Sequence, residues 1–187
     1  MDELTRCQWC GDDPLYISYH DAEWGTPSHD ERYLFEMLCL EGQQAGLSWI
    51  TVLRKREHYR KVFHRFDVKK VAAMSEADID ALLLDAGIIR HRGKLSAIRD
   101  NAIAARALKK EFGSLDAYFW QWVEGKPLLR VPGAGVPAST PLSEKISKDL
   151  KKRGFRFVGA TTVYAFMQSV GMVDDHASHC FRFVSRA

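Results

Sequence analysis

Apolar residues recur at the three- and four-residue spacing of an α-helix along most of this 187-residue chain, and this pattern limits its fold more than any other feature. Segment 30–47 (DERYLFEMLCLEGQQAGL) places its apolar side chains on one stripe, with Asp30 as an N-cap. Segment 48–63 (SWITVLRKREHYRKVF) repeats the pattern. Runs in which apolar and polar residues alternate, as they do in half-buried strands, are too short to count. We therefore predict an all-α fold.

Capping and helix-breaking residues set the bounds of further helices. Ser75 is expected to begin a helix that Gly87 ends, because glycine readily adopts the left-handed conformation found after a helix C-terminus. Two more helices are predicted over about 92–111 and 114–123. The segment Pro127–Pro141 holds four prolines and two glycines, which predicts a long loop before the last helices.

The composition allows a folded core and gives local rather than global charge signals. Hydrophobic residues make up 46% of the chain and charged residues 27%, so we predict a single domain over 1–187, built as two helical lobes. The net charge of +3 says little about partners. Three segments are nevertheless basic: Lys145–Arg156, Arg54–Lys61 and Ile88–Arg99. Each alone is typical of a solvated helix face, whereas together they favour binding to a polyanion.

No segment predicts export or a membrane span. The N-terminal MDELTRCQWC has no apolar run, and the longest stretch without a charge, Phe157–Val173, is shorter than the ~20 residues of a spanning helix. We therefore expect a cytoplasmic protein with no membrane partner. Because disulfides are rare in the cytosol, the four cysteines and seven histidines indicate metal binding or free thiols.

Segment 150–171 (LKKRGFRFVGATTVYAFMQSVG) predicts two helices joined by a short turn with Gly154 and Gly159 on its two sides. In such a helix-hairpin-helix, glycines let backbone N–H groups approach a phosphate, toward which the second helix points its positive dipole end. Lys151, Lys152 and Arg153 add positive charge. An ordinary αα-hairpin with a capping glycine is the alternative. The surrounding charge favours contact with the DNA backbone.

Candidate metal ligands occur at both ends of the chain. In VDDHASHCFRF (173–183), His176 and Cys180 stand four residues apart, on one face if this stretch is helical. Cys7 and His20 lie near the N-terminus. Two sulfurs and two nitrogens would complete a tetrahedral zinc site without an open position, which is a structural rather than a catalytic arrangement.

Spacing alone leaves other ligand sets open. Cys7 and Cys10 form a CxxC pair of the kind found in redox proteins and in zinc sites. His179 competes with His176 as the histidine ligand. A lone cysteine or histidine is also often a core or surface residue without any ligand.

Aromatic residues gather around one carboxylate in two short segments. They are Trp9, Tyr16, Tyr19 and Trp24 in the first segment, and Glu41 and Trp49 in the second. Such rings can form a slot for a flat heterocycle, since stacking on an aromatic side chain stabilises a bound base by ~1–3 kcal/mol. A carboxylate can accept a hydrogen bond from the exocyclic amine of adenine. The alternative is that the rings belong to the core and that Glu41 ends a helix in solvent.

Four long stretches resemble the bacterial DNA-3-methyladenine glycosylase I family. They are DPLYISYHDAEWGTP (13–27), LFEMLCLEGQQAGLSWITVLRKRE (34–57), AGIIRHRGKLSAIRDNA (86–102) and LKKRGFRFVGATTVYAFMQSVGMVDDH (150–176). The resemblance runs from Cys7 to about Cys180. It implies an all-α, helix-hairpin-helix DNA glycosylase-like fold, with a zinc region that staples together about residues 1–25 and 170–187.

The resemblance also assigns residues to sites. Cys10 and His179 drop out as ligands, and one structural zinc ion is implied at Cys7, His20, His176 and Cys180. The implied base-binding residues are Tyr16, Tyr19, Trp24, Glu41 and Trp49, with Trp9 close by. Gly46 and Leu47 are implied to wedge into the duplex gap left by the extruded base, and Gly154, Phe157 and Gly159 to contact the DNA backbone.

One motif is ambiguous. Related glycosylases carry an essential Asp two residues before a His, and VDDH offers Asp174 in that register, with Asp175 beside it. That histidine is His176, which is also an implied zinc ligand. We therefore treat Asp174 as a catalytic candidate beside Glu41.

The function implied by the resemblance is the repair of alkylated double-stranded DNA by a monomeric enzyme. It would extrude 3-methyladenine and hydrolyse its N-glycosidic bond. Methylation at N3 makes the base cationic and weakens the bond, so extraction and recognition become the main tasks. Two alternatives are a non-enzymatic zinc-containing DNA-binding module and a thiol-redox protein that uses Cys7 and Cys10.

Overall fold

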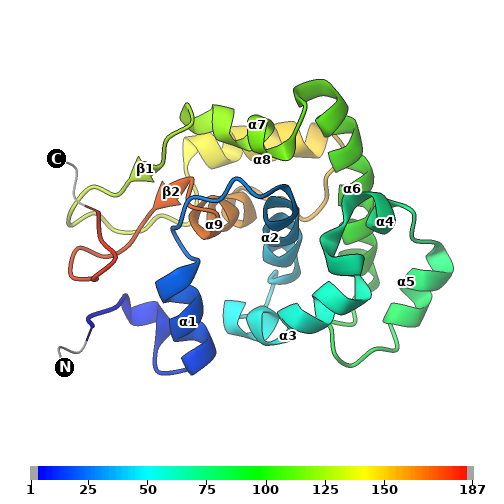
Figure 1. The fold of residues 1–187 in the computed structure, drawn as a ribbon, viewed down its shortest axis with the longest axis horizontal. Helices are drawn as coiled ribbons and strands as arrows, with labels where there is room; N and C mark the ends of the chain where they lie inside the picture. Colours follow the sequence, from blue (N-terminus) through cyan, green and yellow to red (C-terminus); the bar gives the residue numbers. More distant parts are fainter. Residues whose placement is uncertain (1–3, 185–187) are drawn as a thin grey trace.

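The structure is a computed structural model that describes residues 4–184. The predicted mostly helical fold is confirmed (Figure 1). The helices are α1 (Pro14–Ala22), α2 (Glu31–Gln43), α3 (Trp49–Val62), α4 (Val68–Ala72), α5 (Glu76–Leu82), α6 (Arg92–Phe112), α7 (Leu115–Trp120), α8 (Pro141–Lys152) and α9 (Ala160–Ser169), with 3-10 turns η1 (Gln8–Cys10), η2 (His64–Phe66) and η3 (Gln121–Val123). Two-residue strands β1 (Leu128–Leu129) and β2 (Val173–Asp174) depart from the all-α prediction and pair in parallel.

Side-chain caps account for where the helices begin. The Asp30 carboxylate accepts a hydrogen bond from the Tyr33 backbone N–H at 2.7 Å, as predicted. Ser75 and Asp78 form a capping box that begins α5, which confirms the predicted start. Thr140 begins α8 in the same way.

The predicted C-terminal end of the helix that Ser75 begins is wrong. Helix α5 ends at Leu82, five residues before Gly87. Gly87 serves packing instead of capping, because a β-carbon there would lie 2.5 Å from Cδ2 of His58 on α3. The predicted helix over 114–123 is also divided, since the chain tightens into η3 after α7.

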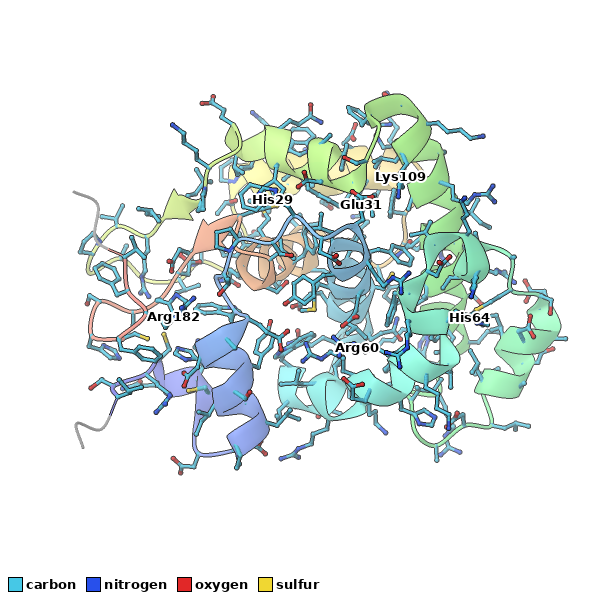
Figure 2. The ribbon with its side chains drawn as sticks, viewed as in Figure 1. His29, Glu31, Arg60, His64, Lys109 and Arg182 are labelled. Carbon is cyan, nitrogen blue, oxygen red and sulfur yellow. The ribbon has the colours of Figure 1, made fainter. Side chains whose placement is uncertain are left out.

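Helix α2 lies at the centre of the molecule and packs against α3, α6, α7 and α9 (Figure 1). Its residues 34–43 are all buried, glutamates included. At its start, Glu31 forms an ion pair with Lys109 of α6 at 2.8 Å (Figure 2). The Glu31 carboxylate also accepts a hydrogen bond from the backbone N–H of Asp116 on α7 at 2.8 Å. The central helix is therefore held rigidly at one end while its other end carries Glu41.

The two ends of the described chain lie side by side, at the left of Figure 1. The Phe181 backbone N–H donates to the Thr5 carbonyl at 2.9 Å. The predicted zinc region thus brings its two segments together within the described residues, while its residues 1–3 and 185–187 lie outside them. Among residues 4–184, no helix combines the length and the apolar character needed to cross a membrane.

Candidate functional site

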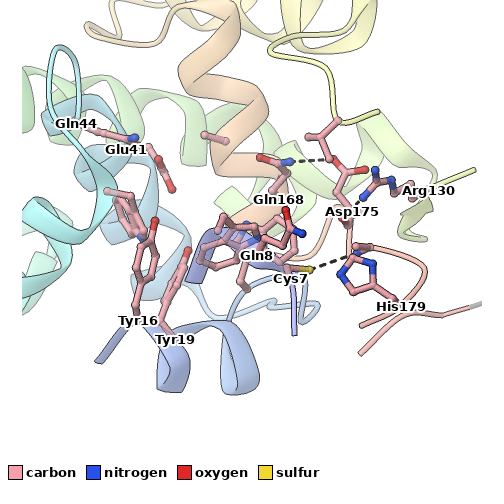
Figure 3. A pocket seen from close by; sticks show the side chains of 16 residues that line it. Cys7, Gln8, Tyr16, Tyr19, Glu41, Gln44, Arg130, Gln168, Asp175 and His179 are labelled. Carbon is pink, nitrogen blue, oxygen red and sulfur yellow. Dashed lines mark hydrogen bonds between the residues drawn. The ribbon is translucent and has the colours of Figure 1, made fainter. Parts of the chain in front are cut away.

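A cavity of about 430 Å³ opens between α1, the C-terminal end of α2, α9 and the segment that follows β2 (Figure 3). All six residues that the sequence indicates for a base pocket lie in its wall. The lining residues are Cys7, Gln8, Trp9, Tyr16, Tyr19, Trp24, Glu41, Gln44, Trp49, Arg130, Val136, Ala165, Gln168, Asp175, Ala177 and His179. These rings line the opening and also belong to the hydrophobic core or pack against it, so the two sequence interpretations are not exclusive.

The aromatic wall is a set of rings packed edge to face. Trp9 contacts Tyr16 and Trp24, with ring centroids 4.9 Å apart in both pairs. Tyr19 packs on Trp49 at 5.5 Å with an interplanar angle of 50°. Because each ring braces the next, the faces that remain toward the cavity are held in place before any ligand arrives.

Glu41 is the acidic group of this wall and is 5% exposed. Its carboxyl has no hydrogen-bond partner within residues 4–184, and burial raises its pKa to about 8. The alternative of a solvated helix-end carboxylate is therefore wrong. A buried carboxyl without a partner, facing a cavity, is suited to receive donors from a ligand.

Several lining residues were missed by sequence reasoning. Arg130 and Val136 come from the Pro/Gly-rich loop, and the Arg130 guanidinium is held by the carbonyls of Ala134 and Asp175. Gln168 reaches the cavity from α9. A lone amide on a helix and an arginine in a loop carry no periodic signal, so no pattern could have found them.

Asp174 and Asp175 have different surroundings. Asp174 accepts hydrogen bonds from the backbone N–H of His176 at 3.1 Å and from its Nδ1 at 2.7 Å. The cavity wall within residues 4–184 includes Asp175 but not Asp174. The Asp174 carboxylate is thus engaged with His176, and its catalytic role stays a prediction.

Three of the four predicted metal ligands converge. One ligand atom each from Cys7, His20 and Cys180 lies within 4.8 Å of the others, and all three residues are buried. The His20 Nε2 lies 3.4 Å from the Cys180 Sγ. The fourth, His176, is next to them, with its ring centroid 5.2 Å from that of His20.

The surroundings of the two histidines fit a metal ion. Nδ1 of His20 contacts Asp21 and Nδ1 of His176 contacts Asp174, each at 2.7 Å, so Nε2 is the nitrogen left for a ligand bond. The His176 Nε2 is buried and has no partner among the described residues. A buried nitrogen without a partner, next to the cluster of Cys7, His20 and Cys180, is suited to be a fourth ligand of a cation.

His176 and Cys180 do not share a helix face, because this stretch is not helical. Cys180 belongs to the cluster with Cys7 and His20, whereas the His176 ring packs against that of His20. The chain after β2 runs as an irregular loop with a turn at 178–179. The rival ligands lie elsewhere: the Cys10 thiol contacts the carbonyl of Cys7 at 3.1 Å, and His179 is exposed at the cavity rim.

The hairpin between α8 and α9 has the geometry that the glycines predict. Gly154 adopts φ +93°, and Gly159 is an N-cap without a side-chain hydrogen bond. Asn101 of α6 clamps the turn, since its Oδ1 accepts from the Arg156 N–H at 2.7 Å and its Nδ2 donates to the Arg156 carbonyl at 3.1 Å. The first N–H groups of α9 therefore remain available on a rigid turn.

The predicted wedge residues lie in the turn between α2 and α3. Gly46 has φ +77°, and Leu47 is 41% exposed although it is a large apolar residue. Both residues line a shallow opening that also includes Glu41 and Thr161 of α9. An apolar tip thus stands beside the entrance to the Glu41 pocket.

Ion pairs reduce the basic character that the sequence shows. Arg153 pairs with Glu111 and Asp149, and Arg156 pairs with Asp100. Arginines of the other two basic segments are likewise paired: Arg54 with Asp13, Arg56 with Glu23, Arg60 with Glu36, Arg92 with Asp80 and Arg99 with Glu76. The backbone geometry of the hairpin is therefore a stronger indication of phosphate binding than the number of basic residues.

Comparison with known proteins agrees with this site. A family model described as methyladenine glycosylase matches residues 9–183. The chain is 55% identical to the DNA-3-methyladenine glycosylase of Haemophilus influenzae over 178 residues, which cover 94% of this chain and 96% of that one. It is 53% identical to DNA-3-methyladenine glycosylase 1 of Escherichia coli, with 95% and 96% covered.

Solved structures give the same result for the fold. A 3-methyladenine DNA glycosylase I from Staphylococcus aureus, described with the structural basis of its 3-methyladenine recognition, is 36% identical and superposes with a TM-score of 0.94 over 98% of this chain and 99% of that chain. A crystal structure of 3-methyladenine DNA glycosylase I at 53% identity gives a TM-score of 0.93 over 96% and 100%.

Proposed function

This chain belongs to the methyladenine glycosylase family, and from that we infer that it is a DNA-3-methyladenine glycosylase I. It is a hydrolase of base-excision repair that cleaves the N-glycosidic bond of 3-methyladenine in alkylated DNA. The observation that carries this function is the preformed cavity that edge-to-face aromatic rings line together with the buried, unpartnered Glu41.

The chemistry asks little of an acid catalyst. When the bond between C1′ and N9 breaks, its electron pair moves to the base and neutralises the positive charge created by methylation. Water supplies a hydroxyl to C1′ and loses a proton. Because the leaving base is neutral and needs no added proton, the chain's residues contribute mainly by binding the extruded base and by selecting the cationic, alkylated base electrostatically over uncharged bases.

Glu41 is the residue proposed for that electrostatic role. In the empty cavity its carboxyl has a pKa of about 8, so it is mostly protonated at neutral pH. A cationic base placed against it would favour the carboxylate, because opposite charges in a poorly solvated site attract strongly. The aromatic wall, which includes Tyr16 and Trp49, would stack on the flat base.

Extrusion of the base involves two further parts of the chain. We propose that Leu47, carried by the Gly46 turn, fills the space that the base leaves, since it is exposed beside the cavity. We propose that Gly154, Phe157 and Gly159 hold backbone phosphates through the free N–H groups of the hairpin. Together these contacts would offset the few kcal/mol that flipping a base costs.

We also propose that Cys7, His20, His176 and Cys180 hold one structural zinc ion. The convergence of three ligands and the buried orphan nitrogen of His176 support this set. When bound, the ion would add folding free energy by joining the two ends of the chain. Asp21 and Asp174 would keep the imidazoles oriented.

The remaining proposals concern organisation. We propose that one domain of two helical lobes acts as a monomer on double-stranded DNA, in the cytoplasm. A non-enzymatic DNA-binding module is not favoured, because such a module would not need a deep cavity with a buried acid. A thiol-redox role does not fit either, since Cys7 belongs to the ligand cluster and Cys10 is buried.

Release of bases from methylated DNA, with products identified by mass, tests the function. The wild-type protein should release 3-methyladenine. Glu41→Gln and Trp49→Ala should each lower kcat/KM by about tenfold or more while the helical circular dichroism is kept. Unchanged release by both variants would mean that the chemistry takes place outside this cavity.

A further inference from the structure

Gln168 presents a hydrogen-bond acceptor to the cavity that the mechanism above does not use. Its side chain enters from α9, and its Nε2 donates to the Asp175 carboxylate at 2.8 Å. Figure 3 shows that the side-chain oxygen lies on the opposite side, toward Glu41. The amide therefore directs its nitrogen away from the aromatic end of the cavity and its oxygen into it.

The orientation of this amide is fixed by a relay of buried groups. Asp175 also accepts from the Tyr164 hydroxyl at 2.5 Å, and both residues are buried. A carboxylate is only an acceptor, so the Gln168 amide must present its N–H₂ group to it. The Gln168 backbone is held as well, because its carbonyl accepts from the Gly25 N–H at 2.9 Å.

We propose that Gln168 is a specificity-determining residue whose side-chain oxygen accepts a hydrogen bond from the exocyclic amine of the bound adenine, with Asp175 as its positioning residue. This rests on the proposed function. The amine has two N–H groups, of which Glu41 takes one and Gln168 the other. Two acceptors that face each other across one cavity match an amino group and no other common substituent of a purine at that position.

The same pair of acceptors discriminates against guanine. A 3-methylguanine presents a carbonyl oxygen at C6, where 3-methyladenine presents the amine. Against Gln168 that oxygen would meet an acceptor instead of a donor, and both buried polar groups would be left unpaired. A site built to bind a donor rejects an analogue that lacks it far more strongly than an apolar pocket does.

Calorimetric binding of two free bases to Gln168→Met tests the proposal. Methionine keeps the length of the side chain and removes the acceptor. We expect 3-methyladenine to bind about five- to tenfold more weakly, which is the scale of one neutral hydrogen bond, while 3-methylpurine, which lacks the 6-amino group, binds as it does to the wild type. Release of 3-methyladenine relative to 3-methylguanine from methylated DNA should also fall.

Asp175→Asn supplies a second, independent test. An asparagine can donate to the Gln168 oxygen and so turn it away from the base. We expect the same selective loss for 3-methyladenine, and no further loss when Asp175→Asn is combined with Gln168→Met, because the two residues act through one contact.

Three results would overturn the assignment. Equal weakening of both bases would show that Gln168 only packs the wall, and unchanged binding of both would show that it touches neither. A wild-type protein that binds neither base would remove the proposed function together with this inference. If Gln168→Met fails to fold, the base selectivity of Asp175→Asn decides alone.

Discussion

Gly25 and His176 lie so close that a β-carbon on Gly25 would stand 2.6 Å from Cε1 and 3.0 Å from Nδ1 of the imidazole. Gly25 also has φ +73°, so the turn after α1 and the ring of His176 occupy adjoining space only because the side chain is absent. The position of the His176 imidazole therefore depends on the missing side chain of Gly25, which is not itself a proposed ligand.

Gly25→Ala should displace His176 and weaken zinc binding by about tenfold or more, as loss of outer contacts of metal ligands does. Competition with a chromophoric chelator measures the affinity. Gly113→Ala is the matched control, since Gly113 has φ +87° and a β-carbon added there would meet nothing within 4 Å. The Gly113→Ala protein should lose a similar free energy of unfolding, because alanine is strained at positive φ, and should bind zinc as the wild type does. Equal zinc affinity in the two variants would place His176 outside the ligand set.

Replacing single cysteines should distinguish the thiols that bind zinc from those that do not. Cys180→Ala is expected to lose zinc and to lower Tm, because a structural ion contributes folding free energy. Cys10→Ala, which removes a buried thiol that contacts the Cys7 carbonyl, should retain one zinc per chain. Metal content by mass spectrometry and thermal unfolding are the measurements. A zinc-free Cys10→Ala protein would contradict the proposed ligands.

Glu41 should make the protein less stable as pH rises. Its pKa is about 8 in the folded chain and ordinarily 4.5, so between these values the folded state holds a proton that the unfolded state has released. Stability is thus greatest below about pH 4.5 for this group and is lost progressively up to about pH 8. Glutamine does not titrate, so the Glu41→Gln protein lacks this loss of stability. Its Tm minus that of the wild type should therefore increase from about pH 5 to about pH 8.

Glu36 provides the control for that series, because it is buried on the same helix but is paired with Arg60 at 2.7 Å. Glu36→Gln should lower Tm at both pH values, since it leaves the guanidinium without its partner. A Glu41→Gln advantage that does not change with pH would show that Glu41 is already ionised in the empty cavity.

Asn101 should affect DNA binding without affecting base binding. Asn101→Ala removes both hydrogen bonds to Arg156 and frees the hairpin turn, so affinity for undamaged duplex DNA should fall several-fold, along with roughly 1–3 kcal/mol of stability. Fluorescence anisotropy of labelled duplex measures this. Ser169→Ala, another buried polar deletion that leaves the hairpin intact, should lose stability alone. If both variants bind DNA equally well, the hairpin is not the phosphate site.

Leu47 should matter only when the substrate is a duplex. Leu47→Ala is expected to lower kcat/KM on methylated duplex DNA severalfold and to leave affinity for free 3-methyladenine and Tm unchanged, because the side chain is exposed to solvent in the free protein. The matched control is Leu84, another exposed leucine, which lies in the turn after α5 and is 84% exposed. Leu84→Ala should change none of these quantities.

Much of the helical framework could be predicted because it is local. Caps such as Asp30 and Ser75 are defined by a few neighbouring residues, and the periodic stripe of α6 is long. Helix α1 has no such stripe: among its residues only Tyr19 and His20 are buried, and Tyr16 and Tyr19 both line the cavity. The end of α5 could not be predicted because Gly87 is required by its contact with His58, which local sequence does not encode.

The candidate site could be predicted where it contains residue types that are rarely found in an ordinary core or surface. A glutamate in an apolar helix and a cluster of cysteines and histidines stand out, and motif resemblance made them specific. The different contacts of Asp174, with His176, and of Asp175, with Tyr164 and Gln168, did not follow from the sequence, because the segment after β2 is irregular and has no periodicity. Gln168 acquires its direction only from Tyr164 and Asp175, both of which had to be placed first.

The meeting of the two chain ends has a consequence for biosynthesis. His20 and Cys180 are 160 positions apart, and Trp24 packs on His176 with centroids 4.7 Å apart. While the chain leaves the ribosome, the aromatic wall translated early has nothing to close against until the segment beyond β2 has followed. A prematurely terminated product would thus lack a finished binding cleft, so incomplete translation yields chains that are unable to hold an extruded base.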